Sequence, residues 1–133
     1  MKKLFLFLLL LSPFFTFSQE WVDDSNFEDK INHKEAFGDD EVSIVVIEFW
    51  AKFNETNSFQ DWEKIKGATY YRVDISKAPV AKKKYRIRMA PTLIVFLDGS
   101  KEDMFKAGLD LICPVNLNEL QEAINDAKKA SQF

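Results

Sequence analysis

The sequence predicts an α/β domain with a mixed sheet, in which parallel and antiparallel strands lie side by side. Two runs, residues 42–51 and 92–97, are almost continuously apolar and rich in β-branched residues, which is typical of strands covered on both faces. Segments with helix-like patterns lie between and after these runs. Asp98-Gly99 follows the second run directly, and this dipeptide is a strong signal for a tight turn between antiparallel strands.

The first 18 residues have the layout of a secretory signal peptide. Two lysines are followed by an unbroken apolar run of leucine and phenylalanine, and the small residue Ser18 precedes the expected cleavage site. The alternative is a permanent membrane anchor, but the apolar stretch is short for a bilayer and Pro13 interrupts it. We therefore expect residues 1–18 to be a signal peptide and residues 19–133 to form one exported domain, periplasmic or secreted, that meets the membrane only during export.

The first elements of this domain are expected to be a short strand, a helix and a long buried strand. Residues 20–22 indicate the short strand, and residues 42–51 the buried one. Between them, Ser25 and Glu28 have the spacing of a capping box, in which a serine caps the helix and a glutamate reaches back to the serine amide. A helix that begins at Ser25 and buries Phe27 is therefore predicted.

The middle of the chain is predicted to continue the alternation of strands and helices. Phe59, Trp62 and Ile65 recur three residues apart, which suits one face of a helix. Residues 69–75 are predicted to form a further strand, and residues 79–85 a short helix.

The last elements are a hairpin and the clearest helix of the sequence. Residues 101–106 can return after the Asp98-Gly99 turn as the partner of the preceding strand. Residues 117–127 then carry an apolar stripe at helical spacing. Asn116 is a good N-cap for this helix, with Glu119 at its third position and Val115 placed to pack onto its first turn.

Composition excludes several classes of function. The chain has one cysteine and one histidine, so it cannot form an intramolecular disulfide or supply a zinc-finger ligand set. The formal net charge of −3 does not suggest a nucleic-acid-binding protein. No phosphate-binding loop or hydrolase motif is present, and we expect neither a metal nor a cofactor.

Three motifs, in order and at the right spacing, make residues 20–130 resemble the thioredoxin family. Residues 48–53 (EFWAKF) are similar to the strand that leads into the family's redox site. Residues 87–92 (IRMAPT) resemble the segment that holds its cis-proline, and Asp98-Gly99 followed by Gly108 fits its last hairpin. The resemblance implies a thioredoxin-like fold, with three α/β/α layers around a central mixed sheet.

The sequence departs from the family at the redox site. Where active members carry two cysteines separated by Gly-Pro, this chain has Asn54, Glu55, Thr56 and Asn57. Thiol–disulfide exchange needs a thiolate and a second thiol, which asparagine side chains cannot replace. We therefore predict a redox-inactive protein that is not an enzyme, in which Asn54 caps the following helix and Glu55 lies in its first turn.

The resemblance also implies a peptide-binding groove beside the cis-proline. Its lining residues in this chain would be Phe53, Ala90, Pro91, Gly108 and Leu109. The leading hypothesis is that the groove binds an exported protein or peptide client by strand addition, as a binding or chaperone-like module. The alternative without a groove is a structural subunit of an exported complex.

Two further residues are candidates for chemistry. Glu48 corresponds to the buried acid that active members place beneath their redox pair, where it is either a proton acceptor with a raised pKa or a residue that merely bonds its neighbours. Cys113 is either a small packed residue or an exposed thiol that exchanges or forms a disulfide with a partner.

Overall fold

The computed structural model describes residues 20–32 and 42–132 of the chain. The predicted signal peptide and His33 lie outside this range. Within it, no helix has the length and apolar character needed to cross a membrane. The elements in chain order are β1 (Glu20–Val22), α2 (Phe27–Ile31), β2 (Ile44–Trp50), η1 (Lys52–Asn57), η2 (Trp62–Lys64), β3 (Thr69–Asp74), η3 (Ile75–Lys77), α3 (Pro79–Lys84), β4 (Thr92–Leu97), β5 (Ser100–Lys106) and α4 (Leu117–Ala130), where η marks a 3₁₀ segment.

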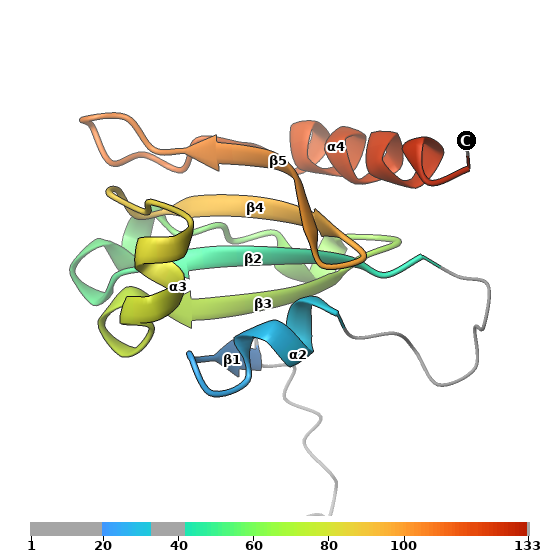
Figure 1. Cartoon of the computed structure of the whole chain (residues 1–133). Coiled ribbons are helices and arrows are strands. Elements are labelled where there is room, and N and C mark those ends of the chain that lie inside the picture. The colour runs from blue at the N-terminus through green and yellow to red at the C-terminus, as the bar shows by residue number, and fades with distance from the viewer. Residues whose placement is uncertain (1–19, 33–41, 133) are drawn as a thin grey trace, which may run out of the picture.

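The strands form one sheet in the order β1-β3-β2-β4-β5 (Figure 1). β1, β3 and β2 are parallel, whereas β4 runs antiparallel to both β2 and β5. The α/β class with a mixed sheet is therefore confirmed. The hairpin between β4 and β5 turns at Asp98 and Gly99, whose φ angles of 49° and 83° are those of a type I′ turn.

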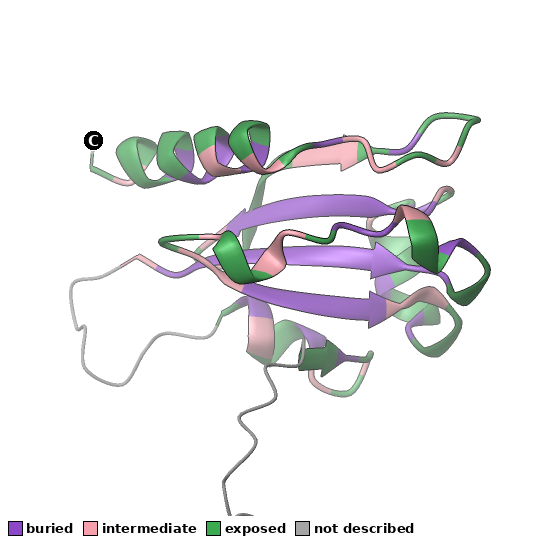
Figure 2. Cartoon of the chain, turned by 180° about the vertical axis from the view of Figure 1, so that it is seen from behind, coloured by how far each residue is buried: buried purple, intermediate pink, exposed green. Residues whose placement is uncertain are grey.

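Helices cover both faces of the sheet, so the fold has three layers. Every residue of β2 is buried, and its side chains alternate between the two faces. One face packs against α2 and α3, where Phe27 and Ala81 are buried. The other packs against α4, through Leu120 and Ile124, and against Phe59. Figure 2 shows the central strands as the buried layer and β5 as a more exposed edge.

The predicted cap of α4 is confirmed. The Asn116 side chain accepts a hydrogen bond from the Glu119 backbone N–H at 2.8 Å. Val115 and Leu120 are buried in the same apolar cluster, as expected when a residue before the cap packs onto the first turn.

The predicted capping box at Ser25 and Glu28 is wrong. The helix begins at Phe27, and no side chain caps its first turn. Ser25 instead gives both its backbone N–H and its hydroxyl to the Asp23 carboxylate, a stronger acceptor that lies two residues earlier. Glu28 pairs with Lys84 of α3 at 2.8 Å.

The predicted helix over Phe59, Trp62 and Ile65 is also wrong, because only the 3₁₀ turn η2 forms there. Phe59 donates its backbone N–H to Glu48 Oε1 at 3.1 Å and accepts a hydrogen bond from Arg72 at its carbonyl, at 3.0 Å. These groups are therefore taken by two buried ionisable residues rather than by helical neighbours. The three apolar side chains still pack on the α4 face, so the spacing identified the buried positions but not the helix.

Candidate functional site

Three connections meet at one end of the sheet (Figure 1). They are the segment after β2, the segment before β4 and the segment after β5. The register explains why they meet, since Phe49 of β2 lies opposite Thr92 of β4, which lies opposite Lys106 of β5. This end of the sheet carries both the asparagine pair and the residues of the predicted groove.

The Asn54 side chain joins these connections. Its amide nitrogen donates to the backbone carbonyls of Ala90 and Leu111, each at 2.8 Å. Its oxygen accepts from the Asn57 amide at 2.8 Å. Asn54 is buried, and both of its donor hydrogens and its acceptor oxygen are used. We call this group of hydrogen bonds the Asn54 clasp.

The prediction that Asn54 caps the following helix is wrong. The segment that follows β2 is the short 3₁₀ helix η1, whose N-cap position is Ala51. Asn54 lies inside this segment with non-helical φ and ψ of −121° and 28°, and its side chain turns to the other connections. Glu55 is exposed in the first turn, where it was expected.

The predicted groove residues fall into two groups. Ala90 and Pro91 are buried, and the peptide bond between them is cis. Phe53 and Leu109 are 77% and 92% exposed, and Gly108 is also on the surface. The structure therefore joins Ala90 to the site through Asn54 and leaves the large apolar side chains in solvent.

Sequence reasoning missed Ile112, which is 56% exposed in the same connection as Leu109. Phe53, Leu109 and Ile112 lie on two connections that the Asn54 side chain joins, and exposed large apolar side chains on neighbouring segments often mark an interaction site. An apolar Leu-Ile pair within a polar connection was the available signal. We call Phe53, Leu109 and Ile112 the apolar surface.

The turn between Leu109 and Ile112, which carries two of the three residues of the apolar surface, has an unusual conformation. Leu111 has φ of 58°, in the left-handed region that costs a non-glycine residue about 1–2 kcal/mol. Its N–H donates to the Gly108 carbonyl at 3.0 Å, and its own carbonyl accepts from Asn54. The Asn54 clasp therefore includes a hydrogen bond to Leu111, the residue of this turn that has the unfavourable positive φ.

Glu48 lies beneath this end of the sheet and is fully buried. One carboxylate oxygen accepts hydrogen bonds from the Phe59 N–H at 3.1 Å, the Tyr70 hydroxyl at 2.5 Å and Arg72 at 3.4 Å. The other oxygen has no hydrogen-bond partner among the described residues. Burial raises the pKa of Glu48, and the nearby Arg72 charge offsets this only in part.

Cys113 is half-buried, and its thiol donates to the Val115 carbonyl at 3.4 Å. Burial raises the pKa of Cys113, with a further contribution from the Glu48 charge. The thiolate is the reactive form of cysteine, so this environment disfavours exchange chemistry at neutral pH.

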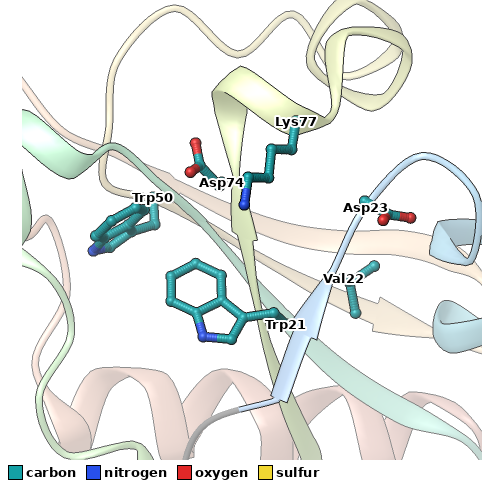
Figure 3. A pocket seen from close by; sticks show the side chains of 6 residues that line it. All are labelled: Trp21, Val22, Asp23, Trp50, Asp74 and Lys77. Atoms are coloured by element: carbon teal, nitrogen blue, oxygen red, sulfur yellow. The ribbon is translucent and has the colours of Figure 1, made fainter.

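A separate pocket of about 360 Å³ opens at the carboxyl ends of the three parallel strands (Figure 3). It is lined by Trp21, Val22, Asp23, Trp50, Asp74 and Lys77. The two indole rings meet edge to face with centroids 5.0 Å apart. Hydrogen bonds from Ser25, and more weakly the Lys77 charge, lower the pKa of Asp23, so that carboxylate is ionised at neutral pH. The pocket therefore offers aromatic walls beside charges of both signs.

The sequence did not reveal this pocket, because its residues come from the ends of strands that pair only in the fold. Within residues 20–32 and 42–132, no group of three or more His, Cys, Asp and Glu side chains could hold a metal ion.

No family model and no curated protein matches the sequence. Solved structures are similar in fold. A mutant thioredoxin from Halobacterium salinarum has a TM-score of 0.60 and 15% identity, covering 85% of this chain and 96% of that chain. A mutant thioredoxin from Entamoeba histolytica has a TM-score of 0.56 and 14% identity, covering 82% and 99%.

Plasmodium falciparum thioredoxin has a TM-score of 0.54 and 19% identity, covering 80% of this chain and 97% of that chain. At these identities the likeness concerns the fold alone. Together with the five-stranded mixed sheet, it shows that the chain has a thioredoxin-like fold.

Proposed function

We propose that this protein is an exported, redox-inactive thioredoxin-like domain that binds an extended segment of a client protein or peptide. The observation that carries the proposal is the Asn54 clasp. In the register given by residues 48–53, Asn54 stands where active members of the family carry a redox cysteine. It makes hydrogen bonds to two other connections rather than offering a reactive group.

The chemistry of the site supports loss of dithiol exchange. A carboxamide nitrogen is not a nucleophile comparable with a thiolate, and the Asn54 nitrogen already donates to Ala90 and Leu111. The chain's single thiol, Cys113, has a raised pKa and donates to Val115. We therefore propose a role in binding and not in catalysis.

The apolar surface supports a role in binding. Complete burial of an exposed leucine, isoleucine or phenylalanine side chain gains about 1.5–3 kcal/mol, so even partial burial of three such residues favours association. An extended segment presents alternate side chains on one side, so these can contact the apolar surface while the peptide backbone is free to hydrogen-bond to the domain. We propose that the client docks apolar side chains against Phe53, Leu109 and Ile112.

Two assays test this proposal. In dithiothreitol-driven insulin reduction, we expect the protein to give no acceleration over buffer. For binding, the probe is reduced and carboxymethylated α-lactalbumin, a permanently unfolded chain, titrated against the wild type and Pro91→Ala. We expect saturable binding that Pro91→Ala weakens. Equal binding by both proteins would show that the turn at Pro91 does not contribute to client binding.

Alkylation of the folded protein decides whether Cys113 provides a thiol activity instead. We expect iodoacetamide to modify native Cys113 more slowly than the same cysteine in the urea-unfolded chain, as measured by mass spectrometry, because burial raises its pKa. Rapid native modification, together with a disulfide-linked partner in non-reducing pull-downs from the exported fraction, would favour the thiol role.

A further inference from the structure

We infer that Asn54 is the positioning residue of the apolar surface: its carboxamide holds the connection after β5 against the Ala90–Pro91 turn, so that Phe53, Leu109 and Ile112 are presented together before any client binds. This inference rests on the proposed function, because the residues that Asn54 positions are the ones proposed to contact the client. It goes further by assigning a role to the asparagine that stands in the redox position.

The first argument is connectivity. Asn54 lies one residue after Phe53, and its amide nitrogen bonds the carbonyl of Leu111, which lies between Leu109 and Ile112. The same nitrogen bonds the carbonyl of Ala90, in the turn before β4. One buried side chain therefore fixes three segments that are separated by 36 and 57 positions along the sequence.

The second argument is the conformation of the turn. Leu111 has a positive φ, and the neighbouring hydrogen bonds are local: Leu111 N–H to Gly108, and Ile112 N–H to the Asp110 side chain. Local bonds shape the turn but do not place it relative to the rest of the domain. Besides Asn54, the Ala107 N–H bonds the Pro91 carbonyl at 3.2 Å, at the start of the connection. Asn54 supplies the bond at the tip, next to the exposed side chains.

The third argument is orientation. The Asn57 amide donates to the Asn54 oxygen, so the Asn54 nitrogen must face the two carbonyls. Aspartate at position 54 would have nearly the same shape but no donor, and would place a carboxylate against two carbonyl oxygens. Asn54→Asp therefore removes the two hydrogen bonds to Ala90 and Leu111, keeps an acceptor for the Asn57 amide, and changes the size of the side chain very little.

The test combines binding with local hydrogen exchange. Against carboxymethylated α-lactalbumin, we expect Asn54→Asp to weaken binding by about tenfold or more, as expected for the loss of two preorganising hydrogen bonds. Leu109→Ser should also weaken binding, because it removes part of the surface itself. Asn118→Asp is the matched control, since it makes the same chemical change at an exposed position of α4.

Amide exchange measured by NMR tests positioning directly. We expect the N–H groups of Leu111 and Ile112 to exchange faster in Asn54→Asp, while amides in the core of β2 keep their protection. A general loss of stability would instead raise exchange in both places. If Asn54→Asp does not fold, Asn54→Ser, which retains one donor, should give an intermediate effect on the same amides.

The outcomes separate this inference from the proposed function. If Leu109→Ser loses binding while folded Asn54→Asp binds like the wild type, the positioning role is overturned and the binding function stands. If the wild type does not bind the probe, the binding function fails, and amide exchange at Leu111 and Ile112 still tests whether Asn54 holds the connection after β5 in place. Unchanged exchange at both amides in Asn54→Asp would overturn the positioning role of Asn54.

Discussion

Glu48 and Arg72 are buried directly opposite each other on β2 and β3. Arg72 lies 3.4 Å from the carboxylate and also donates to the Phe59 carbonyl and, through Nε, to the Tyr70 hydroxyl. The free energy lost when the Glu48 carboxylate leaves water is larger than the free energy gained from one ion pair at this distance, so the pKa of Glu48 is raised. Burial likewise raises the pKa of Tyr70, so its hydroxyl stays protonated and donates a hydrogen bond to Glu48.

The raised pKa of Glu48 predicts a pH dependence of stability. The folded protein keeps the proton on Glu48 at pH values where the unfolded chain, with a carboxyl pKa near 4.5, has lost it. The folded state then binds more protons, so the contribution of Glu48 to the free energy of unfolding falls as the pH rises from about 4.5 towards the folded pKa. Urea unfolding of the wild type and Glu48→Gln at a series of pH values from 4 to 8 measures this.

We expect the glutamine variant to lack this downward component, so that its free energy of unfolding falls less over the same pH interval. The comparison concerns slopes and not absolute values, because Glu48→Gln also replaces the carboxyl group that bonds Tyr70 and Arg72 by an amide, which shifts the whole curve. Parallel curves for the two proteins would show that Glu48 titrates alike in the folded and unfolded states, contrary to the prediction.

Among the elements, α4 depends on local signals that the sequence carries in full. Asn116 accepts from the Glu119 N–H, so Asn116→Ala should lower the free energy of unfolding by about 1 kcal/mol. Asn118→Ala is the control, because this exposed residue on the same helix makes no capping bond and should change stability by about 0.5 kcal/mol or less. Urea unfolding of both variants measures the difference. Equal effects would mean that the cap adds nothing beyond helix propensity.

Other elements depend on contacts that no local pattern contains. The strands could be predicted because burial on both faces requires continuous apolar runs, and the hairpin because Asp98-Gly99 tolerates positive φ. The helix at Phe59 could not be excluded from the sequence, because its backbone groups are taken by Glu48 and Arg72, residues 11 and 13 positions away. The capping box does not form because of a local interaction, in which the Asp23 carboxylate accepts hydrogen bonds from the Ser25 N–H and hydroxyl.

At the scale of the whole molecule, the candidate site also combines features that local sequence predicts with features that depend on contacts between distant segments. The resemblance predicted that positions 54–57 correspond to the family's redox site, and it also predicted the turn at Ala90 and Pro91, whose peptide bond is cis. The partners of Asn54 could not be predicted, because the Leu111 carbonyl is 57 positions away in the sequence and lies beside Asn54 only through the pairing of β5 with β4. The exposure of Ile112 and the pocket at Trp21 likewise depend on how distant segments pack.

The thioredoxin-like fold makes one further prediction about the asparagine pair. Positions 54 and 57 are three residues apart in η1, and their side chains are in hydrogen-bond contact at 2.8 Å even though Asn54 has non-helical φ and ψ. We expect Asn54→Cys with Asn57→Cys, in a Cys113→Ser background, to form an intramolecular disulfide under mild oxidation. Mass spectrometry should detect the loss of two hydrogens and of both alkylation sites.

The single variant Asn57→Cys in the same background controls for intermolecular disulfides, which would appear as dimers on non-reducing gels. The double variant also removes the Asn54 clasp, so we expect it to unfold at a lower urea concentration than the wild type while keeping the far-ultraviolet circular dichroism of an α/β protein. If it folds but both thiols remain open to alkylation after oxidation, the side chains at positions 54 and 57 do not meet as the structure places them. The correspondence with the family's redox pair would then be wrong, and the argument that Asn54 replaces a redox cysteine would lose its basis.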